Sequence, residues 1–431
     1  MRRHAASGFS VPAHTVTTRN LGAAYPLVAE PGLGHRGVLV GHDLLGGSFV
    51  FDPFELYAAG VLSNPNMIVF GQIGRGKSAF VKTYLWRQAV FGRRAWVVDP
   101  KGEYGELAAA WGVTPVSLSP GGSVRLNPLD PGPEVLGSRP VEADGGRRQI
   151  ELLASLATAC LGRPLLPRER VAIDLALAAV TRGPSAPTLP AVVDALLDPG
   201  AESAASIRTD RQTLLEDGRD AALELRRLVH GDLRGMFDGP TTTGLDLDGS
   251  LVVLDLSALY NSPALGVLMA CATAWLQATL ARDAARSSGA RGHVIVVVDE
   301  AWAILANLGV ARWLQASWKL SRAYGVANVA VLHRLSDLHA VGAAGTEQVG
   351  LAHGLLADSE TRVIYAQPPG EVQSAADLLS LSPTEVELLP QLRRGVALWK
   401  VGLRSFLVQH VVGASEQALV DTDAAMMPGR R

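Results

Sequence analysis

The residues best suited to chemistry form a glycine-rich loop, GQIGRGKSAF, at positions 71–80. The spacing G-x-x-x-x-G-K-[ST], typical of loops that bind phosphate, is met by Gly71, Gly76, Lys77 and Ser78. Glycines let the backbone N–H groups turn inward toward anionic oxygens. Lys77 would reach the β- and γ-phosphates of a nucleotide, and Ser78 would place its hydroxyl on Mg²⁺. The alternative is a glycine-rich turn that only joins a strand to a helix.

A second group of chemical interest follows the apolar run 294–298 in HVIVVVDEAW. Five consecutive apolar residues are typical of a central strand that is buried on both faces. Asp299 would lie at the carboxyl end of that strand, where sheets of this type bind ligands, and would hold Mg²⁺ through water. Glu300 would polarise the attacking water. The alternative is a pair of acids that cap the next helix. Together with the loop, the pair predicts an ATPase with ATP and Mg²⁺ as ligands.

The elements around these residues must hold them at one edge of a sheet. Residues 67–70 read as a buried strand before the loop, and residues 78–91 read as a helix after it. Strands and helices alternate over 65–130 and again from 251, which favours a parallel sheet covered by helices. Between them, residues 146–238 are rich in helical patterns. The prediction is an α/β fold of the P-loop NTPase type with an inserted all-helical subdomain.

The C-terminal part carries three further local signals. Ser382 and Glu385 form a capping box with a proline at the first helical position. Two apolar segments, GVALWKVG and RSFLVQHVVG, read as a hairpin. The residues from 414 onward are polar and are predicted to be a flexible tail.

Composition restricts the class of protein. The chain has 431 residues, of which 48% are hydrophobic and 19% charged, so it can bury a large core. Two cysteines in apolar patterns offer neither metal-ligand spacing nor a disulfide framework. The apolar segment 264–280 is shorter than the roughly 20 residues of a membrane span, which favours a buried helix. A formal net charge of −2 argues against a strong overall attraction to DNA, and Arg393-Arg394 is the clearest basic pair.

Six further motifs resemble a known family, and they occur in a characteristic order around the loop. They are GHDLLGGSFVFDPF, RAWVVDPKGEYGEL, RLNPLD, GMFDGPT, VVLDLSAL and VVVDEAW. In this order they are similar to the conjugative-transfer ATPases, the energisers of type IV secretion systems within the FtsK–HerA superfamily of RecA-like motors. The resemblance covers residues 35–413. It implies a RecA-like fold and a homo-oligomeric, hexameric ring at the cytoplasmic side of a membrane channel that exports DNA or protein.

The resemblance also assigns roles to individual residues. The nucleotide-binding set is Gly71, Gly74, Arg75, Gly76, Lys77, Ser78 and Ala79. Asp299, with Ser78, matches the metal-binding position, and Glu300 matches the catalytic acid. Arg322 stands where the family places an arginine that reaches the neighbouring subunit's γ-phosphate; a charge at a helix end is the alternative. His333 replaces the family's glutamine, and a neutral imidazole can still donate one hydrogen bond to the γ-phosphate or the water.

Two other residues carry open alternatives at this stage. Asp99, in DPKGEY, either helps to place the metal or water, or only starts a turn. Arg362 is a second candidate for the arginine that acts across subunits, although a solvated charge at a strand end is the favoured interpretation.

The predicted organisation follows from the motifs and the element pattern. It comprises a strand-rich lead-in at 1–64, a first part of the RecA-like core at 65–145, the helical insertion at 146–240, a second part of the core at 241–413 and a tail at 414–431. The loop begins at residue 71, so the large N-terminal region common in these energisers is expected to be absent or carried by another chain.

The predicted function is an ATP-hydrolysing motor of a conjugation or type IV secretion apparatus. Its expected partners are copies of itself, membrane-channel proteins and DNA, and its expected place is the cytoplasm, at the inner face of the cell membrane. One alternative is a HerA-type DNA translocase or helicase. Another is a nucleotide-gated assembly component with little turnover. Glu300 favours turnover over binding alone.

Overall fold

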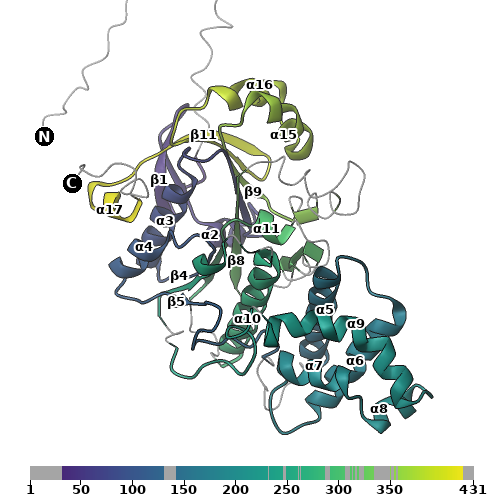
Figure 1. Cartoon of the computed structure of the whole chain (residues 1–431). Coiled ribbons are helices and arrows are strands. Elements are labelled where there is room, and N and C mark those ends of the chain that lie inside the picture. The colour runs from purple at the N-terminus through teal and green to yellow at the C-terminus, as the bar shows by residue number, and fades with distance from the viewer. Residues whose placement is uncertain are drawn as a thin grey trace, which may run out of the picture.

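A computed structural model describes residues 32–130, 142–245 apart from 232, 249–286 apart from 261 and 263, 292–305, 311–319 apart from 313, 316 and 317, 325–333, 350, 354–355 and 358–420. Its strands are β1 Val38–Asp43, β2 Ser48–Phe51, β3 Met67–Phe70, β4 Arg94–Asp99, β5 Val116–Ser117, β6 Leu251–Asp255, β7 Val294–Val298, β8 Val326–Leu332, β9 Thr361–Tyr365, β10 Val396–Val401 and β11 Arg404–His410. In the part of the chain that the structure describes, these strands form one sheet in the order β2-β1-β11-β10-β9-β3-β8-β7-β4-β6-β5 (Figure 1).

The seven strands from β9 to β5 run parallel to one another. Every residue of β3, β7 and β8 is buried, because helices cover both faces of a parallel sheet. In the register, Phe70 at the end of β3 is paired with Leu332 of β8, and Val298 of β7 is paired with Ala330 of β8. The carboxyl ends of these strands therefore meet at one edge, as the alternating sequence pattern predicts.

The other four strands extend the sheet in antiparallel fashion. β10 and β11 form the predicted hairpin, and β10 pairs with β9. β1 pairs with β11 through Gly41 and His410, and β2 pairs with β1. The strand-rich segment near the start of the chain and the hairpin near its end therefore complete the same side of one sheet.

Helices cover both faces of this sheet. The α-helices are α2 Pro53–Ala58, α3 Lys77–Gln88, α4 Gly105–Ala110, α5 Glu142–Leu161, α6 Pro167–Thr181, α7 Leu189–Leu197, α8 Ala201–Ser206, α9 Arg211–His230, α10 Leu265–Arg286, α11 Trp302–Leu305, α15 Val372–Leu379, α16 Pro383–Leu388 and α17 Gln417–Val420. Short 3₁₀ helices are η1 Ala89–Phe91, η2 Ser257–Leu259, η4 Pro369–Glu371, η5 Leu389–Gln391 and η6 Ala414–Glu416. The predicted capping box is confirmed, since the Glu385 amide donates to Ser382 Oγ and the Ser382 amide donates to the Glu385 carboxylate.

Alternate residues of the central strands point to opposite layers of the core. Ile68 and Phe70 of β3 pack in a cluster with α10 and the helices α5–α9, whereas Met67 and Val69 pack with α3, α4 and α17. The helices α5–α9 form a group that lies beside α10 and projects away from the sheet (Figure 1). The sheet thus has a helical layer on each face, and the insertion enlarges one of them.

The apolar segment predicted as a buried helix is α10, in which Trp275 is fully buried. Among the described residues, no helix combines the length and the apolar character that a bilayer crossing requires. Both described cysteines are free; Cys271 is buried and Cys160 is partly buried.

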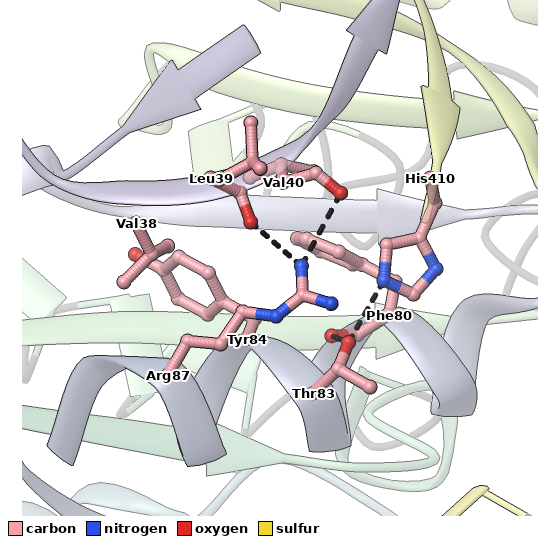
Figure 2. Close-up of a pocket in the computed structure, with 8 residues that line it drawn as sticks. All are labelled: Val38, Leu39, Val40, Phe80, Thr83, Tyr84, Arg87 and His410. Carbon is pink, nitrogen blue, oxygen red and sulfur yellow. Dashed lines mark hydrogen bonds between the residues drawn. The ribbon is translucent and has the colours of Figure 1, made fainter. Parts of the chain in front are cut away.

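The structure corrects the prediction that the flexible tail begins at residue 414. Residues 414–420 form η6 and α17, in which Glu416 and Leu419 are buried. Arg87 of α3 explains the difference, because its guanidinium donates to both carboxylate oxygens of Glu416 at 2.7 and 2.6 Å. The same side chain donates to the carbonyl of Leu39 at 2.6 Å (Figure 2) and to that of Val411 at 2.6 Å. A polar tail segment is therefore held in place by one partly buried cation, and residues 421–431 lie outside the described part.

His410, at the end of β11, lies against α3 beside Arg87 (Figure 2). Its Nε2 is 2.8 Å from Thr83 Oγ1, and the residue is 9% exposed. Burial lowers the pKa of His410 from 6.5 to about 4, and the Arg87 charge acts in the same direction. The imidazole is therefore neutral in the folded protein at pH values where the unfolded chain protonates it.

We expect acid to destabilise the fold through His410. The unfolded state binds a proton below about pH 6.5 and the folded state only below about pH 4, so stability is full above pH 6.5 and falls as the pH drops toward 4. At roughly 1.4 kcal/mol for each pKa unit, the loss is about 2 kcal/mol at pH 5 and reaches about 3.5 kcal/mol as the pH falls below 4. Urea unfolding at pH 7.5 and pH 5 measures it. His410→Gln should flatten this dependence, and an unchanged slope would exclude His410 as its source.

Candidate nucleotide-binding and catalytic site

The predicted phosphate loop connects β3 to α3. Gly74 and Gly76 have φ values of +77° and +109°, in the left-handed region that glycine adopts readily. Gly71 has a second constraint, since a Cβ there would lie 2.4 Å from the Cβ of Tyr365. The three glycines therefore let the loop curl between the ends of β3 and β9. A turn that only joins a strand to a helix does not require three glycines with positive φ. The loop leads directly into the first turn of α3, and the free N–H groups of a helix start can bind phosphate.

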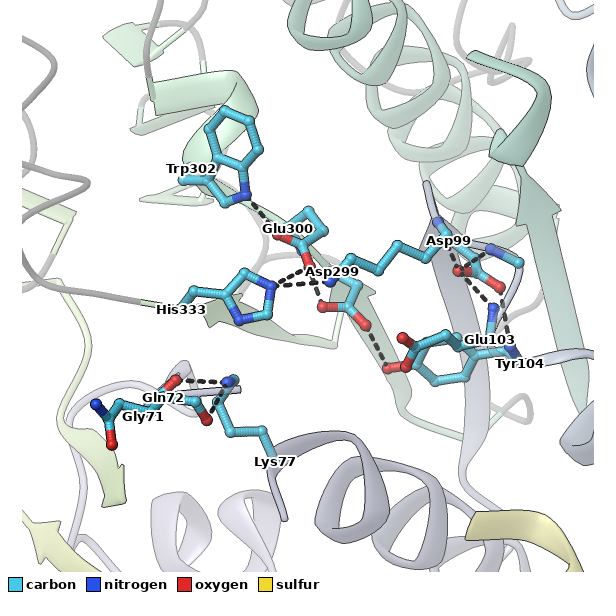
Figure 3. Close-up of polar contacts among 12 residues, drawn as sticks. Gly71, Gln72, Lys77, Asp99, Glu103, Tyr104, Asp299, Glu300, Trp302 and His333 are labelled. Atoms are coloured by element: carbon cyan, nitrogen blue, oxygen red, sulfur yellow. Dashed lines mark hydrogen bonds and ion pairs between the residues drawn. The ribbon is translucent and has the colours of Figure 1, made fainter. Parts of the chain in front are cut away.

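Lys77 is the first residue of α3 and is only 4% exposed. Its Nζ donates to the carbonyl oxygens of Gly71 and Gln72, at 2.5 and 3.0 Å (Figure 3). Burial lowers the pKa of Lys77 to about 8, although the carboxylates of Asp299 and Glu300 act in the opposite direction. The ammonium group thus rests on the loop's own carbonyls, in a place where phosphate oxygens can replace them.

Asp299 follows β7 directly and is 4% exposed. Its carboxylate accepts hydrogen bonds from Tyr104 Oη at 3.2 Å and from the amide of Glu300 at 2.9 Å (Figure 3). Burial raises the pKa of Asp299 to about 7, and the neighbouring charge of Glu300 adds to the effect. A divalent cation would oppose both effects, because it stabilises the ionised carboxylate. The chemistry of this position therefore fits the predicted Mg²⁺ ligand, together with the Ser78 hydroxyl in the first turn of α3.

Glu300 has the most constrained side chain of the site. It is 1% exposed and its φ is +51°, which is unusual for a residue other than glycine. Its Oε1 contacts Lys101. The same oxygen contacts His333, and Oε2 accepts a hydrogen bond from Trp302 Nε1 (Figure 3). Burial alone would raise the pKa of Glu300, but these contacts with His333 and Lys101 outweigh it and lower the pKa to about 2. The side chain is therefore an ionised acceptor that can orient a water molecule rather than a strong base.

His333 follows β8 and turns its Nε2 to Glu300, with Lys101 Nζ 2.9 Å from the same nitrogen. Its Nδ1 is buried and has no hydrogen-bond partner among the described residues. The sequence predicts that His333 donates a hydrogen bond to a γ-phosphate or to water. In the structure the imidazole instead helps to hold Glu300, so any contact with the phosphate would use Nδ1 or a change of position.

Solved structures of known proteins share this arrangement of elements. VirB4 of Thermoanaerobacter pseudethanolicus matches with a TM-score of 0.70 and 21% sequence identity, over 90% of this chain and 100% of that chain. The chain has the VirB4 fold. The bacterial conjugative coupling protein TrwB matches with a TM-score of 0.55 and 14% identity, over 91% of each chain. No protein-family model and no curated protein sequence matches the chain.

The VirB4 fold confirms the predicted P-loop, RecA-like architecture, with its mostly parallel sheet and helical insertion. TrwB has also been solved with ADP and Mg²⁺, and that structure matches with a TM-score of 0.53 and 16% identity over 82% of this chain and 87% of that chain. Nucleotide-binding P-loop NTPases therefore share the fold of this chain. At these identities the likeness concerns the fold, and the roles of single residues remain predictions.

Within the VirB4 fold, Asp99 ends β4 at the same edge of the sheet. Its Oδ1 accepts backbone hydrogen bonds from Lys101, Gly102 and Glu103 at 2.9–3.2 Å, and its Oδ2 accepts one from Tyr104 at 2.9 Å. All these donors belong to the turn that Asp99 starts. The geometry therefore favours the turn-forming alternative over a direct role in placing metal or water.

The two candidate arginines differ in what the structure describes. Arg322 lies outside the described residues. Arg362 is the second residue of β9 and pairs with Ile68 of β3, so it is near the edge opposite to the loop. It is partly buried, and its Nη1 donates to the Leu379 carbonyl at 3.4 Å. Arg362 is therefore a partly buried charge near a strand end, beside the last residue of α15.

The remaining residues of the predicted nucleotide-binding set lie on the loop and in the first turn of α3. Arg75 donates to the side-chain oxygen of Gln72 at 3.1 Å, and its carbonyl accepts from the amide of Gly395 at 2.9 Å. Ala79 is partly exposed. The turn before β10 thus braces the loop from outside.

The sequence prediction missed three residues that shape the site: Lys101, Tyr104 and Trp302. The first two stand in DPKGEY, directly after a strand that ends at the same edge as β7. That position was a usable signal for Lys101 and Tyr104, because polar side chains after neighbouring parallel strands converge. Trp302 has no such signal, since an indole two residues after the acid pair reads equally well as core.

Proposed function

We propose that the chain is an ATP-hydrolysing motor of a conjugation or type IV secretion apparatus, which powers the transfer of DNA or protein or the assembly of the channel. One observation carries the proposal: a buried lysine in a glycine loop and a buried Asp299–Glu300 pair converge at one sheet edge within the VirB4 fold. The matching solved proteins include a conjugative coupling protein and a VirB4, which supports this use of the fold.

The proposed roles of the residues match the groups that phosphoryl transfer requires: a site for the triphosphate, a metal ion and an oriented water molecule. The loop of Gly71, Gly74, Arg75, Gly76, Lys77, Ser78 and Ala79 would hold the triphosphate, and Ser78 and Asp299 would hold Mg²⁺, which would neutralise developing charge. Glu300 would orient the water, and His333 would assist it. Arg322 would act from the neighbouring subunit of a hexameric ring, so each site would be completed by a second copy of the chain.

We also propose the domain division 1–64, 65–145, 146–240, 241–413 and 414–431, with the RecA-like core formed by the second and fourth parts. The proposed partners are further copies of the chain, the membrane-channel proteins of the apparatus, and DNA. The proposed place of action is the cytoplasm at the inner face of the cell membrane, reached through those channel proteins.

The experiment is a phosphate-release assay on the purified chain with ATP and Mg²⁺, with and without DNA, alongside its native mass. We expect hydrolysis together with a multimer whose mass is a multiple of the chain's. Strong stimulation by DNA alone would favour a HerA-type translocase. Tight nucleotide binding without measurable turnover would replace the motor by a nucleotide-gated assembly component.

A further inference from the structure

Three side chains contact the carboxylate of Glu300, and two of them come from segments that are far from it in the sequence. Lys101 comes from the turn after β4, His333 from the end of β8, and Trp302 from the start of α11. We propose that Lys101 is a positioning residue for Glu300, which fixes the carboxylate so that its remaining acceptor site faces the attacking water. The inference rests on the hydrolysis proposed above.

The acceptor sites of the carboxylate support this role. An ionised carboxylate offers about four lone-pair directions. Among the described residues, Lys101 and His333 lie at Oε1, and Trp302 donates to Oε2, so about one direction remains, and it is on Oε2. With both oxygens held, the plane of the carboxylate is fixed. Without Lys101, each oxygen would keep one contact, but Oε1 would lose its ion pair with the ammonium group, so the carboxylate and its remaining acceptor direction would be held less firmly.

The backbone at both ends of the ion pair is held as well. Asp99 accepts four backbone hydrogen bonds from the turn that carries Lys101. Glu300 keeps a left-handed φ of +51°, a conformation that persists only where the surroundings determine it. On its other side, the Lys101 ammonium lies 5.7 Å from the centroid of the Tyr260 ring. The ammonium group is thus placed between an aromatic ring and the carboxylate, with little freedom to leave.

Lys101 differs from an ordinary stabilising lysine in what it contacts. A useful comparison is Lys400, whose Nζ donates to both oxygens of Glu385 at 3.0 and 3.1 Å, near the opposite edge of the sheet. The two lysine side chains are similarly buried, at 21% and 14% exposed. Both pairs would be lost on substitution by methionine, but only the Lys101 pair ends on the predicted catalytic acid.

The test compares kcat and KM for ATP in wild type, Lys101→Met, Lys101→Arg and Lys400→Met. We expect Lys101→Met to lower kcat about 10- to 100-fold, the scale of a misplaced catalytic group, with KM and ATP affinity within about twofold of wild type. Lys101→Arg should recover part of the loss, because a guanidinium keeps the charge. Lys400→Met should lower the melting temperature and leave kcat unchanged.

A double variant separates positioning from a direct action on phosphate. If Lys101 works through Glu300, Lys101→Met should cost no further rate in the Glu300→Gln background. A further loss there, a raised KM, or a normal kcat in Lys101→Met would overturn the inference while leaving the motor function intact. A wild-type chain that binds ATP but does not hydrolyse it would overturn both, so the two failures are distinguishable.

Discussion

Lys77→Ala should abolish ATP hydrolysis and weaken ATP binding. In the structure the ammonium group of Lys77 is buried and held by the carbonyls of Gly71 and Gln72. When a triphosphate enters the loop, its β- and γ-oxygens would take the place of these carbonyls. Without the lysine, the phosphate oxygens would have no side-chain cation from the start of α3, and part of the charge of the transition state would stay uncompensated.

Phosphate release and calorimetric titration with MgATP measure the two effects, and circular dichroism checks the fold. The matched control is Lys319→Ala, at an exposed lysine 3.8 Å from the Asp358 carboxylate, which should keep the wild-type rate and affinity. Turnover close to wild type in Lys77→Ala would mean that the loop at 71–80 is not the site of hydrolysis.

Glu300→Gln should separate binding from chemistry. We expect ATP to bind as in wild type, while turnover falls by roughly 10²-fold or more, the scale of a lost catalytic acid–base group. Binding should persist because Glu300 is 1% exposed and its contacts are with Lys101, His333 and Trp302 rather than with the loop. Turnover should fall because the glutamine side chain has only one acceptor oxygen. Its NH₂ group would face one of the donors that now contact the Glu300 carboxylate, and it could not accept a hydrogen bond from water.

Titration with MgATP and single-turnover hydrolysis check the separation. Glu151→Gln, at an exposed acid paired with Arg147, is the control and should change neither quantity. If Glu300→Gln lost ATP binding instead, Glu300 would be a metal ligand or a structural cap, and Asp299 alone would have to account for the acid chemistry.

The part of the site that the sequence predicts well is local in the chain. The loop needs its glycines at fixed positions, and the run before Asp299 must be a buried strand, so residue type and spacing along the chain are enough to predict both. Contacts between distant segments are different. That Lys101 meets Glu300 depends on β4 and β7 being neighbours in the sheet; the position of Lys101 after a strand indicates the edge of the sheet, but not which strand lies next to it.

Other errors have the same cause. The polar sequence after residue 414 predicts a flexible tail, but one arginine on α3 binds Glu416 and orders it. Arg362 reads as a solvated strand-end charge, but it is partly buried and donates to the carbonyl of Leu379 at the end of α15. In both cases a contact with a distant part of the chain decides the environment of the residue. The sequence around the residue does not indicate such a contact, so local composition gives the wrong prediction.

The pairing of β1 with β11 has a consequence for how the protein is made. Gly41 is among the first described residues to leave the ribosome, whereas its partner His410 is among the last. At roughly 5–20 residues per second, the two are separated by about 20–70 s of synthesis. During that time the β1–β2 hairpin presents a free strand edge, which is open to pairing with the same edge of other nascent chains. The edge closes only when the last hairpin emerges, so the side of the sheet that braces the glycine loop is also the last to fold.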